Sequence, residues 1–254
     1  MVKPDVNIWN EQYPIRFYHV KGDKTVCPSL LCDFMQDSAV NHIEALGHSL
    51  EMLHEQNHGW VLSKMFLELN SLPKWKDQVR IQTWQPGIEK MYALRDYILS
   101  NESEEEIGRA TSFWLAVDME NKKLLKPQTY LRDDVFRKNH RAILKEPRKI
   151  SSVSGADHKM DFIVHENNLD LNGHTNSITY LKWIVKVLKE LIDPEYRMSA
   201  LEINYNGQSF LEDTIYLHSN IQKSEDPQVL ISNHTLINEK SGDVICNATI
   251  EHKK

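Results

Sequence analysis

The chain has 254 residues, of which 41% are hydrophobic, so it can form the core of one large domain or of two smaller ones. Its 30 basic and 36 acidic residues give a net charge of −6, which excludes the strongly basic footprint typical of nucleic-acid-binding proteins. The three cysteines lack metal-binding spacing and are odd in number, which favours reduced thiols. Neither an export signal nor a run of about eighteen apolar residues occurs, so a cytoplasmic protein without a membrane span is expected.

The first half of the chain predicts a strand, a long helix and four further strands. Aromatic and β-branched residues indicate a strand at 13–20, and Pro28 suits the first turn of a helix that continues to about Leu46. Apolar alternation predicts strands at 60–70, 78–85, 91–99 and 107–118. The acidic run at 102–106 is expected at a hairpin tip, because like charges do not share a packed face.

Residues 132–158 are polar, charged and without a period, and they are expected to form a linker on the surface. After them the order of elements repeats, with a strand at 160–165, a helix beginning near Asn176 or Ser177, and strands near 198–206, 213–222, 228–238 and 244–251. The predicted domains are therefore 1–131 and 159–254, joined by the linker.

The two halves also share residues at a constant offset of 136, which pairs Asp77 with Asp213 and Val79 with Ile215. Together with the repeated order of elements, this offset indicates an internal duplication. A long helix followed by antiparallel strands is typical of a hot-dog unit, in which a sheet wraps one helix. The expected fold is therefore an α+β double hot dog.

The residues most able to carry chemistry are Asp170, Asn172 and His174, which lie just ahead of the second helix. In an extended segment, a period of two would put all three side chains on one side. A helix N-terminus favours developing negative charge, so a carboxylate, an amide and an imidazole at this place suit an attack on an acyl carbonyl. The alternative interpretation is a polar loop in which Asp and Asn form local turns and the histidine is solvated.

The run Asp170, Asn172, His174, Asn176, Tyr180 and Trp183 resembles the signature of the acyl-acyl carrier protein thioesterases of plant plastids and many bacteria. The segments 73–77, 83–84, 94–97 and 108–114 resemble further signatures of this family, so the likeness extends over nearly the whole chain from about residue 13. One departure follows the strand near 198–206. Where the family has an acidic residue and a cysteine, this chain has Gln208 and Ser209.

The resemblance implies a double hot dog that hydrolyses the thioester of a fatty acyl-[acyl carrier protein], releases the free fatty acid, ends chain elongation, and uses neither a metal nor a cofactor. His174 is expected to act as the base, Asn172 to position substrate or water, and Asp170 to orient Asn172 or the imidazole. Gln208 is neutral, so it is expected only to position water. Backbone N–H groups near Gly173 to Ser177 are expected to hold the oxyanion.

Carried upstream, the offset of 136 sets Phe34, Gln36 and Ser38 opposite the polar trio, so one active site per chain is expected, with the first helix free to line an acyl pocket. The implied partner is an acidic acyl carrier protein, and a homodimer is left open. Candidate basic residues for docking are Lys182, Lys186 and Lys189 on the second helix, and Arg137, Lys138, Arg141, Arg148 and Lys149 in the linker.

The sequence is also compatible with three other functions of the same fold, and it contains one rival motif. An acyl-CoA thioesterase, a hot-dog 3-hydroxyacyl dehydratase and a non-catalytic acyl-binding protein use the same fold. The run at 54–58, HEQNH, fits the zinc protease pattern, but that chemistry needs a continuing helix and a third ligand, whereas Gly59 and a predicted strand follow directly. A solvated helix end is the simpler interpretation of that run.

Overall fold

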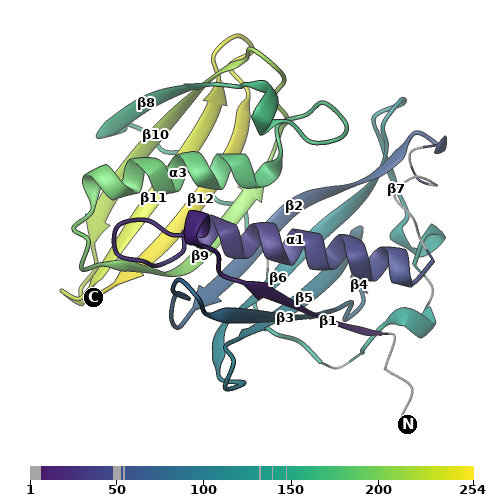
Figure 1. The fold of residues 1–254 in the computed structure, drawn as a ribbon. Coiled ribbons are helices and arrows are strands. Elements are labelled where there is room, and N and C mark those ends of the chain that lie inside the picture. Colours follow the sequence, from purple (N-terminus) through teal and green to yellow (C-terminus); the bar gives the residue numbers. More distant parts are fainter. Residues whose placement is uncertain (1–6, 48–52, 54, 132, 139, 147) are drawn as a thin grey trace. The chain divides into compact units, whose positions relative to one another are not determined.

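The computed structural model describes residues 7–47, 53, 55–131, 133–138, 140–146 and 148–254 (Figure 1). The chain divides into two compact units, unit 1 (Met1–Lys145) and unit 2 (Glu146–Lys254). This division lies inside the segment 132–158, which the sequence predicts as a linker. The predicted boundaries at 131 and 159 stay a prediction.

Unit 1 is an antiparallel sheet with one long helix. Its strands are hydrogen-bonded in the order β1-β3-β5-β6-β2, with β4 paired to β5 and β7 paired to β6. The elements are β1 (Ile8–Pro14), α1 (Pro28–Ala45), β2 (His58–Leu69), β3 (Gln78–Trp84), β4 (Ile88–Glu89), β5 (Tyr92–Ser100), β6 (Glu106–Asp118) and β7 (Lys123–Leu125). The helix begins at Pro28 as predicted, because a first-turn residue needs no N–H.

The first strand was predicted too far along the chain. β1 ends at Pro14, whose ring leaves no N–H for a ladder, and a short 3₁₀ helix follows at Phe17–His19. The aromatic side chains that favoured a strand at 13–20 include Phe17 and Tyr18, which are exposed rather than packed in the core.

Unit 2 repeats this arrangement with fewer strands, in the order β9-β12-β11-β10-β8. Its elements are β8 (His158–Ile163), a 3₁₀ helix at Glu166–Asn168, α3 (Ser177–Leu191), β9 (Arg197–Tyr205), β10 (Thr214–Lys223), β11 (Val229–Asn238) and β12 (Val244–Lys253). Every pairing within this sheet is antiparallel. The predicted strands near 198–206, 213–222, 228–238 and 244–251 are confirmed.

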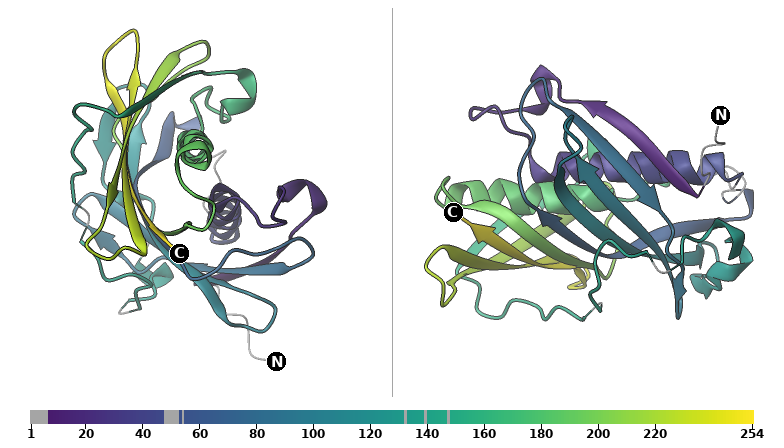
Figure 2. Two further views of the ribbon diagram at one scale, coloured as in Figure 1. Left: turned by 90° about the vertical axis from the view of Figure 1, so that its left-hand side faces the viewer. Right: turned by 90° about the horizontal axis from the view of Figure 1, so that it is seen from below.

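In each unit the long helix lies against one face of its own sheet (Figure 1). Figure 2 shows α3 end-on, with the sheet of unit 2 curving around it. Leu181 and Ile184 of α3 have no exposed surface, and neither do Ile203, Ile215 and Leu217 of the sheet. A curved sheet that encloses one apolar helix is a hot-dog unit. The chain is a double hot dog, as the sequence predicts.

The internal duplication is visible in equivalent contacts of the two units. Tyr13 of β1 stacks on Phe34 of α1 at 4.3 Å between ring centroids, and Phe162 of β8 stacks on Trp183 of α3 at 5.0 Å. The N–H of Lys74 donates to the carboxylate of Asp77 at 2.7 Å, and Phe210 donates to Asp213 in the same way at 2.8 Å. The aspartates differ by 136 residues, as predicted, whereas the stacked aromatics differ by 149.

The offset therefore changes along the chain, and the predicted alignment of Phe34, Gln36 and Ser38 with the polar trio is wrong. Gly173 donates its N–H to the carbonyl of Asp170 at 3.1 Å, and Lys24 donates to Lys21 at 2.7 Å in the matching turn of unit 1. The offset of 149 sets Lys21, Asp23 and Thr25 opposite Asp170, Asn172 and His174. Unit 1 still has neither an imidazole nor an amide at these places.

The segment 132–158 is less exposed than expected for a surface linker. Val135, Ala142, Ile143 and Ile150 are all buried. Ile143 packs in a core cluster with Phe66, Leu94 and Phe113 of unit 1. These four apolar residues are buried although they follow no helical or strand period, which is why periodicity did not reveal them, whereas Leu144 in the same segment is exposed.

A chain of polar side chains crosses the buried interior of unit 2. Ser219 Oγ lies 2.8 Å from His234 Nδ1, whose Nε2 lies 2.9 Å from Ser232 Oγ, and this hydroxyl lies 2.9 Å from His252 Nε2. Burial lowers the pKa of His234 to about 3 and that of His252 to about 4 from the ordinary value of 6.5. Both imidazoles are therefore neutral at neutral pH.

We predict that the free energy of unfolding falls steeply in mild acid. The unfolded chain takes up a proton on each of these histidines near pH 6.5, whereas the folded chain does so only near pH 4 for His252 and pH 3 for His234. The unfolded state binds more protons across this window, so the stability is full above pH 6.5 and is lost as the pH falls. Each histidine should contribute on the order of 1 kcal/mol per pH unit.

Urea unfolding followed by circular dichroism at several pH values measures this slope. His234→Asn should make the slope shallower, whereas His158→Asn, on the exposed start of β8, should leave it unchanged. Equal slopes for His234→Asn and the wild type would contradict the prediction.

Candidate active site

The polar trio lies in a tight turn between the 3₁₀ helix at Glu166–Asn168 and α3. The N–H of Asp170 donates to the carbonyl of His174 at 2.7 Å, and Gly173 has a φ of +76°, which suits glycine. The chain therefore folds back on itself, and the prediction of an extended segment with three side chains on one side is wrong. Local hydrogen bonds of the aspartate outweigh a strand conformation that has no neighbouring strand to pair with.

The Asp170 carboxylate holds this turn from inside. Its Oδ1 accepts the N–H of Asn172 at 2.8 Å and the N–H of His174 at 3.1 Å. One carboxylate oxygen thus fixes the backbone of both other members of the trio. Asp170 orients Asn172 and His174 through their backbones, as in the Asx turn of the alternative interpretation, and not through the imidazole ring.

The side chains of the trio differ in exposure. Asn172 is exposed, whereas His174 is half-buried, with its ring edge-on to Phe210 at 5.2 Å between ring centroids. Phe210 itself is half-exposed. The imidazole is therefore partly shielded by an aromatic ring, while the amide of Asn172, two residues earlier, remains open to a ligand.

Gln208 lies in the loop between β9 and β10, and its side chain is exposed. This loop is tied to the turn, because the N–H of Thr175 donates to the carbonyl of Ser209 at 2.9 Å. The structure therefore brings Ser209, which follows Gln208, into contact with Thr175, which follows His174.

A buried cluster of hydroxyl groups supports the turn, and sequence reasoning missed it. Ser209 has no exposed surface, and its Oγ lies 2.7 Å from Thr175 Oγ1 and 2.9 Å from the Tyr180 hydroxyl. Burial raises the pKa of Tyr180, so this hydroxyl stays protonated. The cluster joins the turn, the first helical turn of α3 and the β9–β10 loop. Its signal in the sequence was weak, since three separate hydroxyl residues have no recognisable spacing.

The helix begins where the sequence predicted. Asn176 is the N-cap of α3, and its side chain accepts the N–H of Ile178 at 2.9 Å. The positive end of the helix dipole therefore lies two residues after His174. An imidazole, an exposed amide and a helix N-terminus together can accept a proton from water and stabilise a developing negative charge.

The zinc protease pattern does not hold as a metal site. Its first histidine, His54, lies outside the described residues, and His58 begins strand β2 with its Nδ1 2.7 Å from the Tyr130 hydroxyl. The helical geometry that the pattern requires is therefore missing at its second histidine. Among the described residues, no group of three or more His, Cys, Asp or Glu side chains could hold a metal ion.

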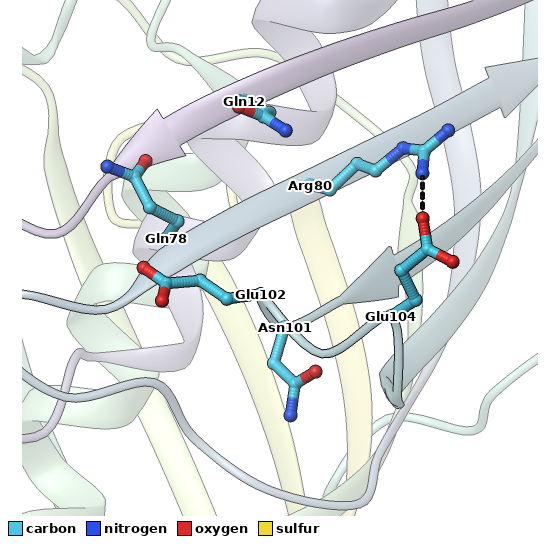
Figure 3. A pocket seen from close by; sticks show the side chains of 6 residues that line it. All are labelled: Gln12, Gln78, Arg80, Asn101, Glu102 and Glu104. Carbon is cyan, nitrogen blue, oxygen red and sulfur yellow. Dashed lines mark hydrogen bonds and ion pairs between the residues drawn. The ribbon is translucent and has the colours of Figure 1, made fainter.

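A pocket of about 160 Å³ lies in unit 1, lined by Gln12, Gln78, Arg80, Asn101, Glu102 and Glu104 (Figure 3). Arg80 and Glu104 form an ion pair at 3.2 Å within it. The lining contains neither a nucleophile nor an imidazole, so the pocket offers no chemistry for an acyl group.

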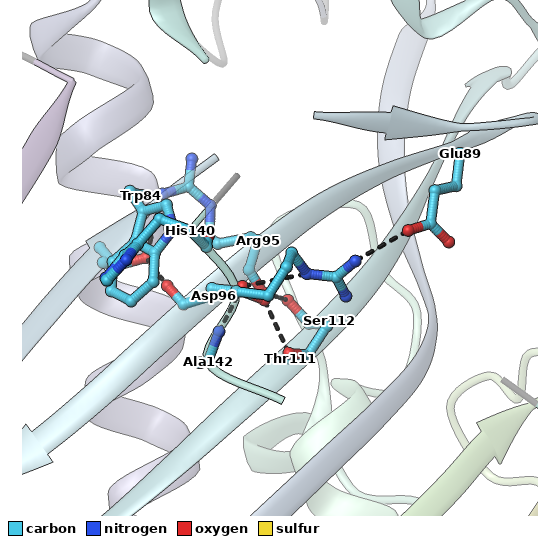
Figure 4. Close-up of polar contacts among 10 residues, drawn as sticks. Trp84, Glu89, Arg95, Asp96, Thr111, Ser112, His140 and Ala142 are labelled. Atoms are coloured by element: carbon cyan, nitrogen blue, oxygen red, sulfur yellow. Dashed lines mark hydrogen bonds and ion pairs between the residues drawn. The ribbon is translucent and has the colours of Figure 1, made fainter. Parts of the chain in front are cut away.

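The predicted signature at 94–97 belongs to a buried polar network in unit 1 (Figure 4). The Asp96 carboxylate accepts the Thr111 hydroxyl at 2.6 Å, the N–H of Ala142 at 2.8 Å and Nε of Arg141 at 3.2 Å. Burial raises the pKa of Asp96 in spite of these bonds, which act in the opposite direction. Because every partner comes from the chain itself, this network anchors the segment around Ala142 to the sheet.

Comparison with known proteins identifies the family. A family model described as the acyl-ACP thioesterase N-terminal domain matches residues 6–134, and one described as the C-terminal domain matches residues 151–254. The chain belongs to the acyl-ACP thioesterase family. Among the described residues, no helix is long and apolar enough to cross a membrane.

Curated relatives include the oleoyl-acyl carrier protein thioesterase 2 of Arabidopsis thaliana, which is 24% identical over 89% of this chain and 66% of the relative. The palmitoyl-acyl carrier protein thioesterase of Gossypium hirsutum is 27% identical over 79% of this chain and 52% of the relative. Both are described as chloroplastic. The chain thus spans between about half and two-thirds of the length of these relatives.

Two solved structures share the fold over nearly the whole chain. An acyl-ACP thioesterase from Bacteroides thetaiotaomicron has a TM-score of 0.84 at 20% identity and covers 97% of this chain and 98% of its own. The 12:0-ACP thioesterase from Umbellularia californica has a TM-score of 0.85 at 18% identity and covers 97% and 94%. Both support the double hot dog.

We predict that the role of Asp170 depends on hydrogen-bond acceptance rather than on charge. Asp170→Asn keeps an oxygen that can accept both N–H groups, so it should lower the free energy of unfolding by less than about 1 kcal/mol. Asp170→Ala removes that acceptor and should cost about 2 kcal/mol, because two backbone donors lose their partner. Chemical denaturation of both variants measures the difference. Equal losses for Asn and Ala would show that the carboxylate charge, not the turn, matters.

Proposed function

We propose that the protein hydrolyses the thioester of a fatty acyl-[acyl carrier protein] and releases the free fatty acid. The observation that carries this proposal is the turn at Asp170–His174, which presents an imidazole and an amide at the N-terminus of α3 in a chain of this family. Thioester hydrolysis needs a base for water and a donor for the carbonyl oxygen, and this turn supplies one of each.

His174 is the proposed base. Its imidazole takes a proton from the attacking water, and the same proton then passes to the departing thiolate, so the ring returns to its starting state. Histidine suits this role because its charge changes near neutral pH. General base catalysis of this kind contributes roughly 10²–10⁴ in rate.

Asn172 is the proposed donor to the carbonyl oxygen. The sequence favoured backbone N–H groups between Gly173 and Ser177 for this role, but four of them already donate within the protein. Gly173 donates to Asp170 O, His174 to Asp170 Oδ1, Thr175 to Ser209 O and Asn176 to Asn168 O. The exposed Asn172 amide can donate without breaking any of these bonds, and the helix dipole beyond Asn176 favours the same negative charge.

Gln208 and Ser209 have minor roles in this proposal. Gln208 is exposed and neutral, so it positions water at most. Ser209 bonds to two other hydroxyls in a fully buried place, which does not suit a nucleophile. Water, rather than a side chain, therefore attacks the carbonyl. The cytoplasmic location, the homodimer and one active site per chain remain predictions.

We predict that His174→Ala lowers kcat for a long-chain acyl-[acyl carrier protein] by about 10²–10⁴-fold, because the variant has no base for water. Release of the free thiol, followed with a thiol reagent, measures kcat. His158→Ala removes an exposed histidine of β8 and serves as the matched control with unchanged turnover.

Two outcomes would contradict this proposal. Wild-type turnover by His174→Ala would remove the imidazole from the reaction. Absence of thiol release by the wild type on carrier-bound substrates of any chain length would instead favour a dehydratase or an acyl-binding protein. A clear preference for the CoA thioester would identify an acyl-CoA thioesterase.

A further inference from the structure

The loops next to β1 and β3 in unit 1 expose three large aromatic side chains. Phe17 is 74% exposed, Tyr18 is 79% exposed and Trp75 is 39% exposed. Large aromatic side chains in a folded protein are usually buried, and a cluster of them on the surface marks an interaction site. Tryptophan and tyrosine are also enriched among the residues that dominate binding at protein interfaces.

Basic residues surround these rings. Arg16, Lys21, Lys24, Lys74 and Lys76 are exposed in the same two loops, and together with Phe17, Tyr18 and Trp75 they form what we call the aromatic–basic patch. The two nearby carboxylates are both engaged by the loops themselves. Asp23 accepts the N–H and the hydroxyl of Thr25, and Asp77 accepts the N–H of Lys74. Five cations against two bonded anions make this region positive on a chain with a net charge of −6.

The patch is held in a fixed shape. The N–H of Trp75 donates to the carbonyl of Lys24 at 3.0 Å, and that of Lys76 donates to Ile15 at 3.1 Å. Phe17 meets the Trp75 ring edge-on at 5.9 Å between centroids, and Lys76 Nζ lies 4.9 Å from the same ring centroid. A surface ordered before binding loses little conformational entropy when a partner docks.

Unit 2 shows that the fold does not require these residues. At the matching places it has Glu166 for Phe17, Asn167 for Tyr18, Asp170 for Lys21, Leu211 for Trp75 and Glu212 for Lys76. The backbone is equivalent, since Lys76 and Glu212 both have a positive φ. The N–H of Lys76 donates to the carbonyl of Ile15, which directly follows β1, and the N–H of Glu212 donates to the carbonyl of Val164, which directly follows β8. The same backbone is thus built without Phe17, Tyr18, Trp75, Lys21 and Lys76, although unit 2 has the half-exposed Phe210 in place of Lys74.

We propose that the aromatic–basic patch is the docking surface for an acidic partner protein, which under the proposed function is the acyl carrier protein that delivers the thioester. Complementary charge speeds the encounter and fixes the orientation of the partner, and the rings supply the apolar contact. The net negative charge of the chain disfavours an anionic membrane as the occupant. The exposed lysines of α3, Lys182, Lys186 and Lys189, were the sequence-based candidates, but the described part of α3 exposes no large hydrophobic side chain beside them.

The test exchanges residues of the patch for those that unit 2 holds on the same backbone. The variant carries Lys21→Asp, Trp75→Leu and Lys76→Glu, each compatible with the loop conformation because unit 2 accepts it. The matched control carries Lys182→Glu and Lys186→Glu on α3. Thermal unfolding confirms that both proteins are folded, and thiol release is then measured with carrier-bound and CoA-bound forms of one acyl chain.

The patch variant should raise KM for the carrier-bound substrate by about tenfold or more with kcat unchanged, and it should leave kcat/KM for the CoA thioester within about twofold. The α3 control should leave both substrates within about twofold. An unchanged KM for the carrier-bound substrate, or an equal rise for both substrates, would overturn the docking surface while leaving the proposed hydrolysis intact.

Two further measurements separate the remaining outcomes. If the wild type releases no thiol, binding of the fluorescently labelled carrier protein replaces KM, and loss of binding in the patch variant still supports the docking surface. Vesicles of phosphatidylglycerol and phosphatidylethanolamine test the membrane. Binding to vesicles that depends on the patch, with carrier affinity unchanged, would overturn the proposal in favour of a lipid surface.

Discussion

Each unit depends on one backbone hydrogen bond that fixes the start of its helix on its sheet. In unit 2 the N–H of Thr175 donates to Ser209, and in unit 1 the N–H of Val26 donates to Pro73. Each bond joins the loop ahead of the long helix to the loop ahead of β10 or β3, the strand next to the outer strand β8 or β1, so the helix N-terminus, its dipole and the preceding turn keep a constant place on the sheet. In unit 2 the buried hydroxyls of Thr175, Ser209 and Tyr180 reinforce this bond. The buried Ser209 hydroxyl therefore has a structural role at this junction.

Much of the fold followed from periodicity, and the errors share one cause. Long strands and both helices have apolar repeats because one face of each is buried, and these were predicted with nearly correct bounds. The turn at Asp170–His174, the short β1 and the buried Ile143 depend on contacts that sequence spacing does not encode. The change of offset from 136 to 149 reflects 13 additional residues in unit 1 between the helix start and β3, and a repeat with an insertion cannot be aligned without the structure. Of the candidate site, the residues of the turn were found, whereas their geometry and the hydroxyl cluster were not.

Duplication of the scaffold separates what the fold needs from what function adds. Residues retained in both units, such as Asp77 and Asp213, bond to backbone and keep the loop in shape. Residues that differ on the same backbone are free of that constraint. The loop side chains differ between the units, with the half-buried His174 and the exposed Asn172 in unit 2 and exposed aromatic rings and lysines in unit 1. Under the two proposals above, two copies of one loop serve chemistry and recognition without a change of fold.

The turn also limits how the imidazole can be activated. Asp170 Oδ1 accepts two backbone N–H groups, and Gln208 carries no charge, so the contacts of Asp170 in the turn are to the backbone of Asn172 and His174 and not to the imidazole ring. In the described part of the chain, no carboxylate is hydrogen-bonded to His174, whose ring meets the edge of Phe210 instead. In the proposed reaction the imidazole therefore acts without a hydrogen-bonded carboxylate, which suits a thioester, since a thiolate leaves readily and the carbonyl needs only modest activation. The sequence departure at Gln208 and the geometry of the turn are therefore consistent with one another.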